Sequence, residues 1–262
     1  MVICRLARFG RLFLIVGWLF AGTTGPGFAA GPVLELFTED YPPLTFERNG
    51  DVGGGGVEIV REILHRAGLT ATINLVPWSR GYARTLRQEN TGLFVTALTK
   101  ERELLFKWVG PIASTRGQLY ARKGVGMKVE NLADAGRVRH VAVPRDWYLH
   151  EILLKAGLTN VHAVATPQQA LRMLDAGRVD LVALNDVNIE PVAREVGLDP
   201  ERFEAVYLVS ESPKYIVFSM KTSDTIVNAC RQALASMMAD GAMAEIYRKW
   251  LPGLVPPVKP DR

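Results

Sequence analysis

Short apolar runs and amphipathic helical patterns alternate along the first part of the chain, and this alternation restricts the possible folds more than any other feature. The runs at 33–38, 72–76 and 92–96 have the length and residue types of buried strands. Between them, residues 57–68 and 77–86 place apolar side chains at the spacing of one helical face. This β-α-β-α-β order favours a parallel sheet with right-handed connections and helices on its faces. We therefore predict an α/β fold.

A second set of strand and helix patterns repeats this plan later in the chain. The expected strands are 139–143, 162–166 and 179–184, and the expected helices are 147–156, 167–176 and 187–196. Two further strands, at 206–210 and 215–220, would carry the chain back before helices at 224–239 and 242–250. The pattern predicts two α/β lobes joined by extended crossings near residues 117–123 and 207–217.

The first 30 residues have the composition of an export signal. Arg5, Arg8 and Arg11 form a basic start, and the apolar segment 12–21 is too short to cross a bilayer comfortably. Small residues up to Ala30 then suit cleavage by a signal peptidase. An uncleaved membrane anchor is the alternative. We expect cleavage near Ala30 and a mature protein outside the cytoplasm.

The charge and cysteine content of the remaining chain argue against nucleic-acid binding and against an internal disulfide. The sequence has 31 basic and 27 acidic residues, but three arginines and no acidic residue lie in the first 30, which leaves 28 basic against 27 acidic residues. This balance gives no support for a nucleic-acid partner. Cys4 lies in the export segment and Cys230 in a predicted helix, so no internal disulfide is expected. We interpret Cys230 as a small buried apolar residue.

The stretch 96–111, TALTKERELLFKWVGP, has the arrangement that most favours ligand binding. Thr99 is typical of a helix N-cap, with Glu101 and Glu103 in the first turn, where negative charge suits the helix dipole. Arg102 does not fit this pattern, because a cation is unfavourable at a helix N-terminus. Beside free backbone N–H groups and threonine hydroxyls, its guanidinium would bind a carboxylate. The alternative is a solvated arginine paired with a neighbouring glutamate.

Other motifs give little support for nucleotide binding or catalysis. The glycine run 53–56 precedes a helix, but it lacks the lysine of a Walker motif and the spacing of a dinucleotide-binding turn. His65, His140, His150 and His162 are scattered without metal-ligand spacing, and neither G-x-S-x-G nor H-E-x-x-H occurs. We therefore expect no metal and no cofactor.

Several short motifs, taken in order, resemble the periplasmic solute-binding proteins of family 3, the polar amino-acid type. The matching stretches are Tyr41-Pro42-Pro43 with Phe46, the glycine-rich turn 50–56, Glu58, Thr99-Lys100-Glu101-Arg102, WVGP at 108–111 and GRVDL at 177–181. The resemblance covers nearly the whole chain after residue 30. It implies a two-lobe clamp of the periplasmic-binding-protein type II class, in which each lobe is a mostly parallel sheet flanked by helices.

The resemblance also implies the limits of the two lobes. A signal peptide at 1–30 would be followed by a first lobe made of 31–120 and 212–262, with 121–211 as the second lobe. In such a clamp, ligand binding closes the lobes by a hinge motion and buries the solute between them.

The same resemblance implies a set of binding residues in the first lobe. The arginine of the family's T-x-E-R motif binds the carboxylate of the ligand, and this position is Arg102. Thr96 and Thr99 would supply hydroxyl or amide groups nearby. Tyr41 and Trp78 are candidates for an aromatic wall over an aliphatic or cationic ligand group. For Trp78, packing in the core is the alternative.

The second lobe departs from the family pattern. Members that bind α-amino acids place an aspartate near the end of a second-lobe strand, where it holds the ammonium of the ligand. The matching position is Asn185, and Asp186 follows one residue later, where it would face the cleft only if a bulge turned it inward. A further anion contact is expected around Asp146, and Arg145 could bind a second acid group. We therefore expect a ligand with at least one carboxylate and no obligatory α-ammonium.

The leading hypothesis is a non-catalytic binding protein that captures a small carboxylate-bearing, amino-acid-like solute and delivers it to an inner-membrane ABC permease. One alternative is a secreted, dehydratase-like enzyme of the same fold, with Asp186, Glu58 and Glu39 as candidate acids or bases. Another is a periplasmic sensor input protein. We expect a periplasmic monomer.

Overall fold

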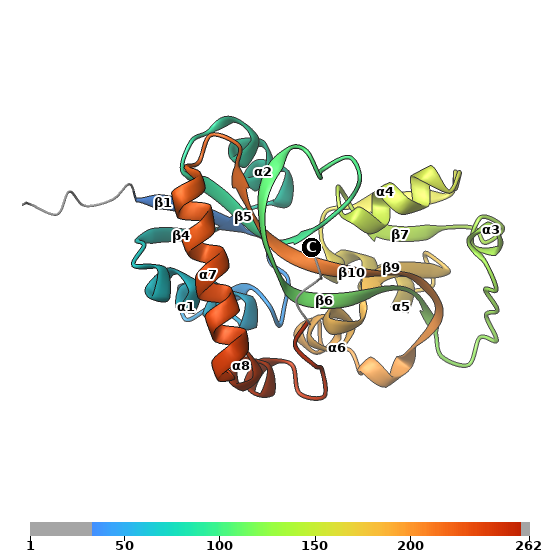
Figure 1. Ribbon diagram of the computed structural model, residues 1–262. Coiled ribbons are helices and arrows are strands. Elements are labelled where there is room, and N and C mark those ends of the chain that lie inside the picture. The colour runs from blue at the N-terminus through green and yellow to red at the C-terminus, as the bar shows by residue number, and fades with distance from the viewer. Residues whose placement is uncertain (1–32, 258–262) are drawn as a thin grey trace, which may run out of the picture. The chain divides into compact units, whose positions relative to one another are not determined.

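The computed structural model describes residues 33–257, which form helices around an eight-stranded sheet (Figure 1). The predicted export signal and its cleavage site near Ala30 lie outside this range. The strand order is β4-β1-β5-β10-β6-β9-β7-β8. The strands of the sheet are β1 (Leu34–Thr38), β4 (Ala71–Leu75), β5 (Thr91–Ala97), β6 (Phe106–Arg122), β7 (Val141–Pro144), β8 (Val161–Val164), β9 (Leu181–Asn185) and β10 (Phe203–Ser219).

The helices connect these strands, and a separate hairpin follows β1. The helices are α1 (Gly55–Ala67), α2 (Trp78–Arg87), α3 (Leu132–Ala135), α4 (Tyr148–Lys155), α5 (Pro167–Asp175), α6 (Asp186–Glu195), α7 (Asp224–Asp240) and α8 (Ala242–Trp250). The hairpin pairs β2 (Phe46–Arg48) with β3 (Asp51–Gly53). Within residues 33–257, none of the helices is both long and apolar enough to cross a bilayer.

Each end of the sheet is parallel, as the alternation of strands and helices predicts. Strand β1 lies between β4 and β5, and β7 lies between β8 and β9, with all four pairs parallel. We call β1, β4 and β5 with α1, α2, α7 and α8 the first lobe, and β7–β9 with α3–α6 the second lobe. The α/β class is confirmed.

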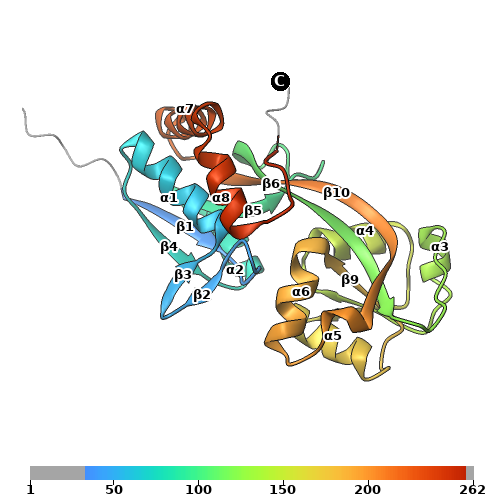
Figure 2. The same ribbon diagram turned by 90° about the horizontal axis from the view of Figure 1, so that it is seen from below.

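Two long antiparallel strands run through both lobes (Figure 2). Strands β6 and β10 each have 17 residues and pair from Phe203 opposite Arg122 to Ser219 opposite Phe106. The prediction of two separate strands at 206–210 and 215–220 is therefore wrong. Polar residues and Pro213 interrupt the apolar pattern there, but the ladder continues through irregularities in register. The predicted lobe limits at 120/121 and 211/212 fall inside these strands.

Helix packing on the first lobe follows the predicted apolar face. In α1, Val57, Ile59, Val60 and Ile63 are buried, and each such side chain contributes about 1.5–3 kcal/mol when fully removed from water. Gly68 ends the helix in the left-handed conformation with φ 65°, as a glycine C-cap does. The buried face of α1 packs against α7 and α8 in the first lobe.

Candidate functional site

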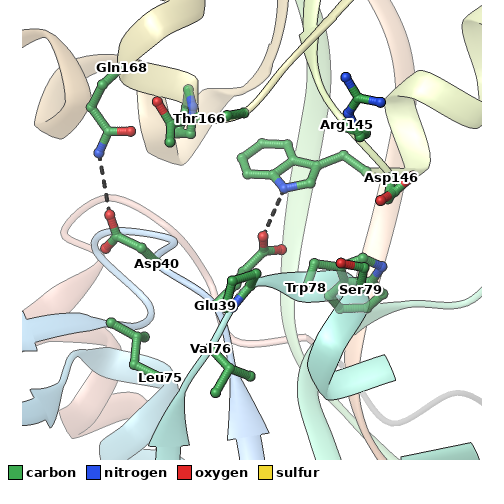
Figure 3. A pocket seen from close by; sticks show the side chains of 14 residues that line it. Glu39, Asp40, Leu75, Val76, Trp78, Ser79, Arg145, Asp146, Thr166 and Gln168 are labelled. Carbon is green, nitrogen blue, oxygen red and sulfur yellow. Dashed lines mark hydrogen bonds between the residues drawn. The ribbon is translucent and has the colours of Figure 1, made fainter. Parts of the chain in front are cut away.

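A cavity of about 440 Å³ lies between the loops that follow the strands of the two lobes (Figure 3). We call it the outer cavity. From the first lobe it is lined by residues at the ends of β1 and β4, and from the second lobe by residues at the ends of β7 and β8. The lining residues are Glu39, Asp40, Leu75, Val76, Pro77, Trp78, Ser79, Arg145, Asp146, Trp147, Ala165, Thr166, Pro167 and Gln168.

A smaller space, of about 20 Å³, lies against the sheet, and we call it the inner cavity. It shares Glu39, Trp78 and Trp147 with the outer cavity, so these three side chains form the boundary between the two. Its lining residues are Glu39, Tyr41, Trp78, Val95, Ala97, Arg102, Trp147, Tyr148 and Lys214. In contrast to the outer cavity, this space contains several charged groups that are almost fully removed from solvent.

Arg102 is one of these buried charges, with 4% of its surface exposed. The predicted helix that would begin at Thr99 is wrong, because residues 100–105 form successive turns before β6 starts at Phe106. The Arg102 N–H donates to the Thr99 carbonyl at 3.0 Å, which is a three-residue turn spacing. The short distance to β6 leaves no room for a longer helix. Arg102 nevertheless points to the inner cavity.

The guanidinium of Arg102 is held by aromatic rings and by one carboxylate. Its Cζ atom lies 5.0 Å from the ring centroid of Trp78 and 5.6 Å from that of Tyr82, within the range of cation–π contact. It also donates to and forms an ion pair with Glu151, which lies in α4 of the second lobe. Glu151 therefore occupies a donor on one nitrogen of the Arg102 guanidinium.

A second ion pair joins the same turn to α4. Glu101 and Lys155 lie 2.5 Å apart, and the pKa of Glu101 is lowered to about 2, mainly by this contact with Lys155. Because Glu151 and Lys155 are four residues apart, they lie on one face of α4. This face lies against the turn, so that Glu151 pairs with Arg102 and Lys155 pairs with Glu101. This pair is exposed and contributes little to stability by itself.

Glu39 and Trp147 join the two lobes across the boundary of the cavities. The indole Nε1 of Trp147 donates to Glu39 Oε2 at 2.9 Å, and the Trp147 ring packs 5.1 Å from that of Tyr41. Burial raises the pKa of Glu39 to about 7, although the Trp147 hydrogen bond and the positive charges of Lys214 and Arg102 oppose this shift. Next to it, Gln168 donates to Asp40 at 3.3 Å (Figure 3).

Lys214 is a site residue that the sequence reasoning missed. It lies in the middle of β10, is 1% exposed, and its Nζ sits 3.8 Å from the ring centroid of Tyr148. Burial lowers its pKa to about 7, and the nearby Arg102 charge acts in the same direction. The available signal was a lysine directly before the apolar strand pattern YIVFS, a position that a sheet would bury.

A β-bulge shapes the floor of the inner cavity. In the pairing of β5 with β10, Thr96 is opposite Tyr215 and Phe94 is opposite Ile216, which leaves Val95 as an extra residue. Val95 has φ 61°, a rare conformation for a β-branched residue. Such strain is found where the surrounding structure requires a particular side-chain direction. Here it places Val95 and Ala97 against the inner cavity.

The two predicted threonines do not line either cavity. Thr96 is buried in β5, and its hydroxyl donates to the carbonyl oxygen of Leu93 at 3.3 Å. Thr99 precedes the turn, and its carbonyl accepts from the N–H groups of Arg102 and Glu103. Both residues therefore shape the backbone around Arg102. Of the other first-lobe predictions, Tyr41 and Trp78 line the inner cavity, and Trp78 also lines the outer one.

The predicted second-lobe residues fall at three separate places. Asn185 ends β9 and is fully buried, where its Oδ1 accepts from the hydroxyls of Thr115, at 3.2 Å, and Tyr148. Asp186 begins α6, accepts from the Arg116 N–H at 3.0 Å and pairs with the Arg116 side chain at 3.6 Å. Asp146 is exposed in the outer cavity. Neither Asn185 nor Asp186 lines the outer or the inner cavity.

The acidic and histidine side chains of residues 33–257 include no group of three that is placed to hold a metal ion. What the arrangement offers is binding chemistry. The inner cavity contains two cations, Arg102 and Lys214, one carboxyl group, Glu39, and the aromatic rings around them. These groups suit the acidic end of a small polar molecule whose remainder occupies the adjoining outer cavity.

The fold is shared with solved binding proteins. A histidine kinase sensor domain with similarity to periplasmic binding proteins superposes with a TM-score of 0.77 at 25% identity, covering 86% of this chain and 98% of the other. A periplasmic His/Glu/Gln/Arg/opine family-binding protein from Silicibacter pomeroyi, in complex with lysine, has a TM-score of 0.71 at 19% identity, covering 86% and 100%. The arginine-, lysine-, histidine-binding protein ArtJ from Geobacillus stearothermophilus has a TM-score of 0.71 at 18% identity, covering 86% and 97%.

Sequence comparison gives one partial match and one match over most of the chain. A probable translation initiation factor IF-2 from Natronomonas pharaonis is 26% identical over 227 residues, or 79% of this chain, but the chain spans only 37% of its length. This partial match carries no functional assignment. The model of bacterial extracellular solute-binding proteins, family 3, matches residues 36–253. The chain therefore belongs to family 3 of the bacterial extracellular solute-binding proteins.

Proposed function

We propose that this protein is a non-catalytic, periplasmic binding protein that captures a small carboxylate-bearing solute and delivers it to an inner-membrane ABC permease. The observation that carries the proposal is the buried guanidinium of Arg102 in the wall of the inner cavity. A buried arginine beside a polar cavity suits a planar carboxylate, which can accept two parallel hydrogen bonds. Family membership supports the binding role.

The position of the cavities supports the same proposal. The outer cavity lies at the carboxyl ends of β1 and β4 in the first lobe and of β7 and β8 in the second. In parallel α/β sheets this edge is where ligands bind, because loops and helix N-termini converge there. The outer cavity, at about 440 Å³, is within the size range of small-molecule sites.

The similar solved structures support an amino-acid-like ligand. One holds lysine, and another is described as binding arginine, lysine and histidine. These ligands share a carboxylate, the group for which Arg102 is suited. The remainder of the ligand is not carried over, since the identities of 18–19% reflect the fold.

Substitution of Arg102 by alanine tests the proposal. Arg102→Ala should weaken the binding of carboxylate ligands by about 2–5 kcal/mol, as expected for loss of a buried, charge-assisted pair. Isothermal titration calorimetry with a panel of amino acids and small organic acids measures the change. Arg116→Ala is the matched control, because it removes an exposed arginine whose ion pair with Asp186 lies outside the cavities. Equal affinity in the wild-type and Arg102→Ala proteins would contradict the proposal.

A sensor role is the second candidate, and the similarity to a histidine kinase sensor domain favours it. In that case the loaded protein would act on a separate membrane receptor. The two roles differ in what the loaded protein activates. Ligand-dependent stimulation of ATP hydrolysis by an ABC permease in proteoliposomes supports delivery, whereas ligand-dependent phosphorylation of a histidine kinase supports sensing.

A further inference from the structure

Lys214 occupies an unusual position for a charged residue. Its backbone lies in the interior of the sheet, opposite Ala97 of β5 and Ala113 of β6, and its side chain lines the inner cavity. The two alanines leave space for a long side chain between the strands. Lysine is rarely buried to this extent unless it has a partner, because removing an ammonium group from water is costly.

The structure gives this ammonium no hydrogen-bond acceptor. Within residues 33–257, the Lys214 Nζ forms no hydrogen bond or ion pair, and it lies 3.8 Å from the ring centroid of Tyr148. The other groups that act on it do so through their charge: Arg102, Glu39 and Asp186. The side chain lines the inner cavity, so an oxygen atom of a ligand there is an acceptor that the described residues do not supply.

The chemistry of Lys214 determines which ligand groups it accepts. An ammonium group has three donors and no acceptor, so it attracts oxygen atoms and repels another ammonium group. Arg102, the proposed carboxylate anchor, lines the same cavity. An α-amino acid bound to Arg102 brings an ammonium group close to Lys214, whose pKa of about 7 leaves it partly protonated near neutral pH, and a nearby positive charge disfavours the protonated form further. An acid with an oxygen substituent brings an acceptor instead.

Glu39 is the one acidic residue among those that line the inner cavity, and it is the alternative partner for a ligand ammonium. Its Oε2 already accepts the Trp147 indole N–H. Its pKa of about 7 also keeps the carboxyl group partly protonated near neutral pH, so it is a weak acceptor for an ammonium group. Glu39 therefore compensates only part of the positive charge.

From these contacts we propose that Lys214 determines specificity by selecting acids that carry a second oxygen acceptor, in a 2-oxo group, a 2-hydroxyl group or a second carboxylate, in place of an α-ammonium. The proposal rests on the proposed function, because it takes Arg102 as the anchor of the first carboxylate. It adds a second contact, made by a residue of a strand that runs through both lobes.

Calorimetry with matched ligands tests this inference. One set is pyruvate, L-lactate and L-alanine, and the other is 2-oxoglutarate, glutarate and L-glutamate. The wild-type protein should bind at least one oxygen-bearing acid about tenfold or more tightly than its amino counterpart. Lys214→Met, which keeps the length of the side chain, should weaken that acid about tenfold or more and abolish the preference, as for one charge-assisted hydrogen bond. Lys123→Met is the control, because Lys123 is exposed and pairs with Glu201.

The outcomes separate this inference from the proposed function. If the wild-type protein prefers the amino acids, or if Lys214→Met keeps the preference for oxygen-bearing acids, the inference is wrong while binding itself stands. If Arg102→Ala leaves all affinities unchanged but Lys214→Met removes the preference, Lys214 is supported and the anchor is wrong. If no acid in the panel binds, both are overturned. Thermal unfolding checks the variant, since loss of a buried charge should not lower its melting temperature.

Discussion

The two lobes contribute different kinds of groups to the cavities. The first lobe and the long strand β10 supply the buried Arg102 and Lys214 and the half-buried Glu39. The second lobe supplies Trp147 and Tyr148, whose rings cover these charges, and Glu151, which pairs with Arg102. The charges are thus held by strand β10, by the turn that follows β5 and by the residue that follows β1, whereas the rings that cover them and the carboxylate that pairs with Arg102 come from α4 and the residue before it.

This difference indicates a division of roles between the lobes. Charges anchored in strands and tight turns have little freedom to adjust, so they select the polar end of the ligand. Aromatic rings on the opposite lobe exclude water and strengthen those interactions when the lobes meet. This division of roles can be tested by substituting residues of each lobe separately, beginning with the substitution for which the largest effect is expected.

The largest effect is expected for Lys214 of β10, whose burial should make the free energy of unfolding depend on pH. The folded protein releases the Lys214 proton near pH 7, but the unfolded chain holds it up to its ordinary pKa of 10.5, so stability should rise with pH between these values. From about pH 7 to pH 9, the free energy of unfolding of wild-type protein should increase by roughly 2–3 kcal/mol relative to Lys214→Met. Urea denaturation at both pH values measures the difference.

Glu39 makes the opposite contribution to the pH dependence of stability, and it does so below pH 7. Its pKa of about 7 lies above the ordinary 4.5, so the folded state holds a proton that the unfolded chain has released, and stability should fall as pH rises between these values. The fall in stability due to Glu39 therefore ends near pH 7, where the rise due to Lys214 begins. Lys123→Met serves again as the control for loss of a charge. Parallel profiles of unfolding free energy against pH for the wild-type and Lys214→Met proteins would show that folding does not lower the pKa of Lys214.

A smaller effect is expected from the second-lobe competitor. Glu151→Gln removes the carboxylate that pairs with Arg102, so ligand carboxylates should bind about three- to tenfold more tightly, or by roughly 1 kcal/mol. Glu101→Gln is the control, because it removes the adjacent ion pair with Lys155 and leaves Arg102 untouched. Weaker binding by Glu151→Gln would mean that Glu151 contacts the ligand itself.

The smallest effect is expected at the end of β9. Asp186 accepts from Arg116 and does not line a cavity, so Asp186→Asn should change ligand affinity by less than about threefold. Calorimetry with the amino members of the two ligand sets provides the measurement. A loss above tenfold that is confined to amino acids would identify Asp186 as the ammonium partner and overturn the division of roles between the lobes.

Local sequence patterns predicted the α/β architecture well, because burial of one face of each element leaves a periodic signal. The apolar face of α1 and the apolar run of β9 are examples. The same reasoning failed at residues 99–105, where cap-like residues introduce turns. A capping residue indicates the start of a turn, but the length of the helix depends on where the next strand must begin.

The site was predictable only in part, because its geometry depends on contacts between distant segments. Arg102 was recognised from a local motif. Lys214 was not, since its neighbours Ala97 and Tyr148 lie more than sixty residues away in the chain and come together only through strand pairing and α4 packing. The bulge at Val95, which directs side chains to the inner cavity, leaves no sequence signal either, because valine is a common strand residue.

If Arg102 is the carboxylate anchor, as proposed, its pairing with Glu151 also raises the solute concentration needed to load the protein. A carboxylate attached to the same chain acts like a competitor at a constant effective concentration, which for tethered groups is on the order of millimolar. If Glu151 holds Arg102 nine-tenths of the time, the apparent dissociation constant is about tenfold higher than the intrinsic one. A single α4 side chain thus adjusts the threshold at which the protein responds to its surroundings, without altering the atoms that recognise the solute.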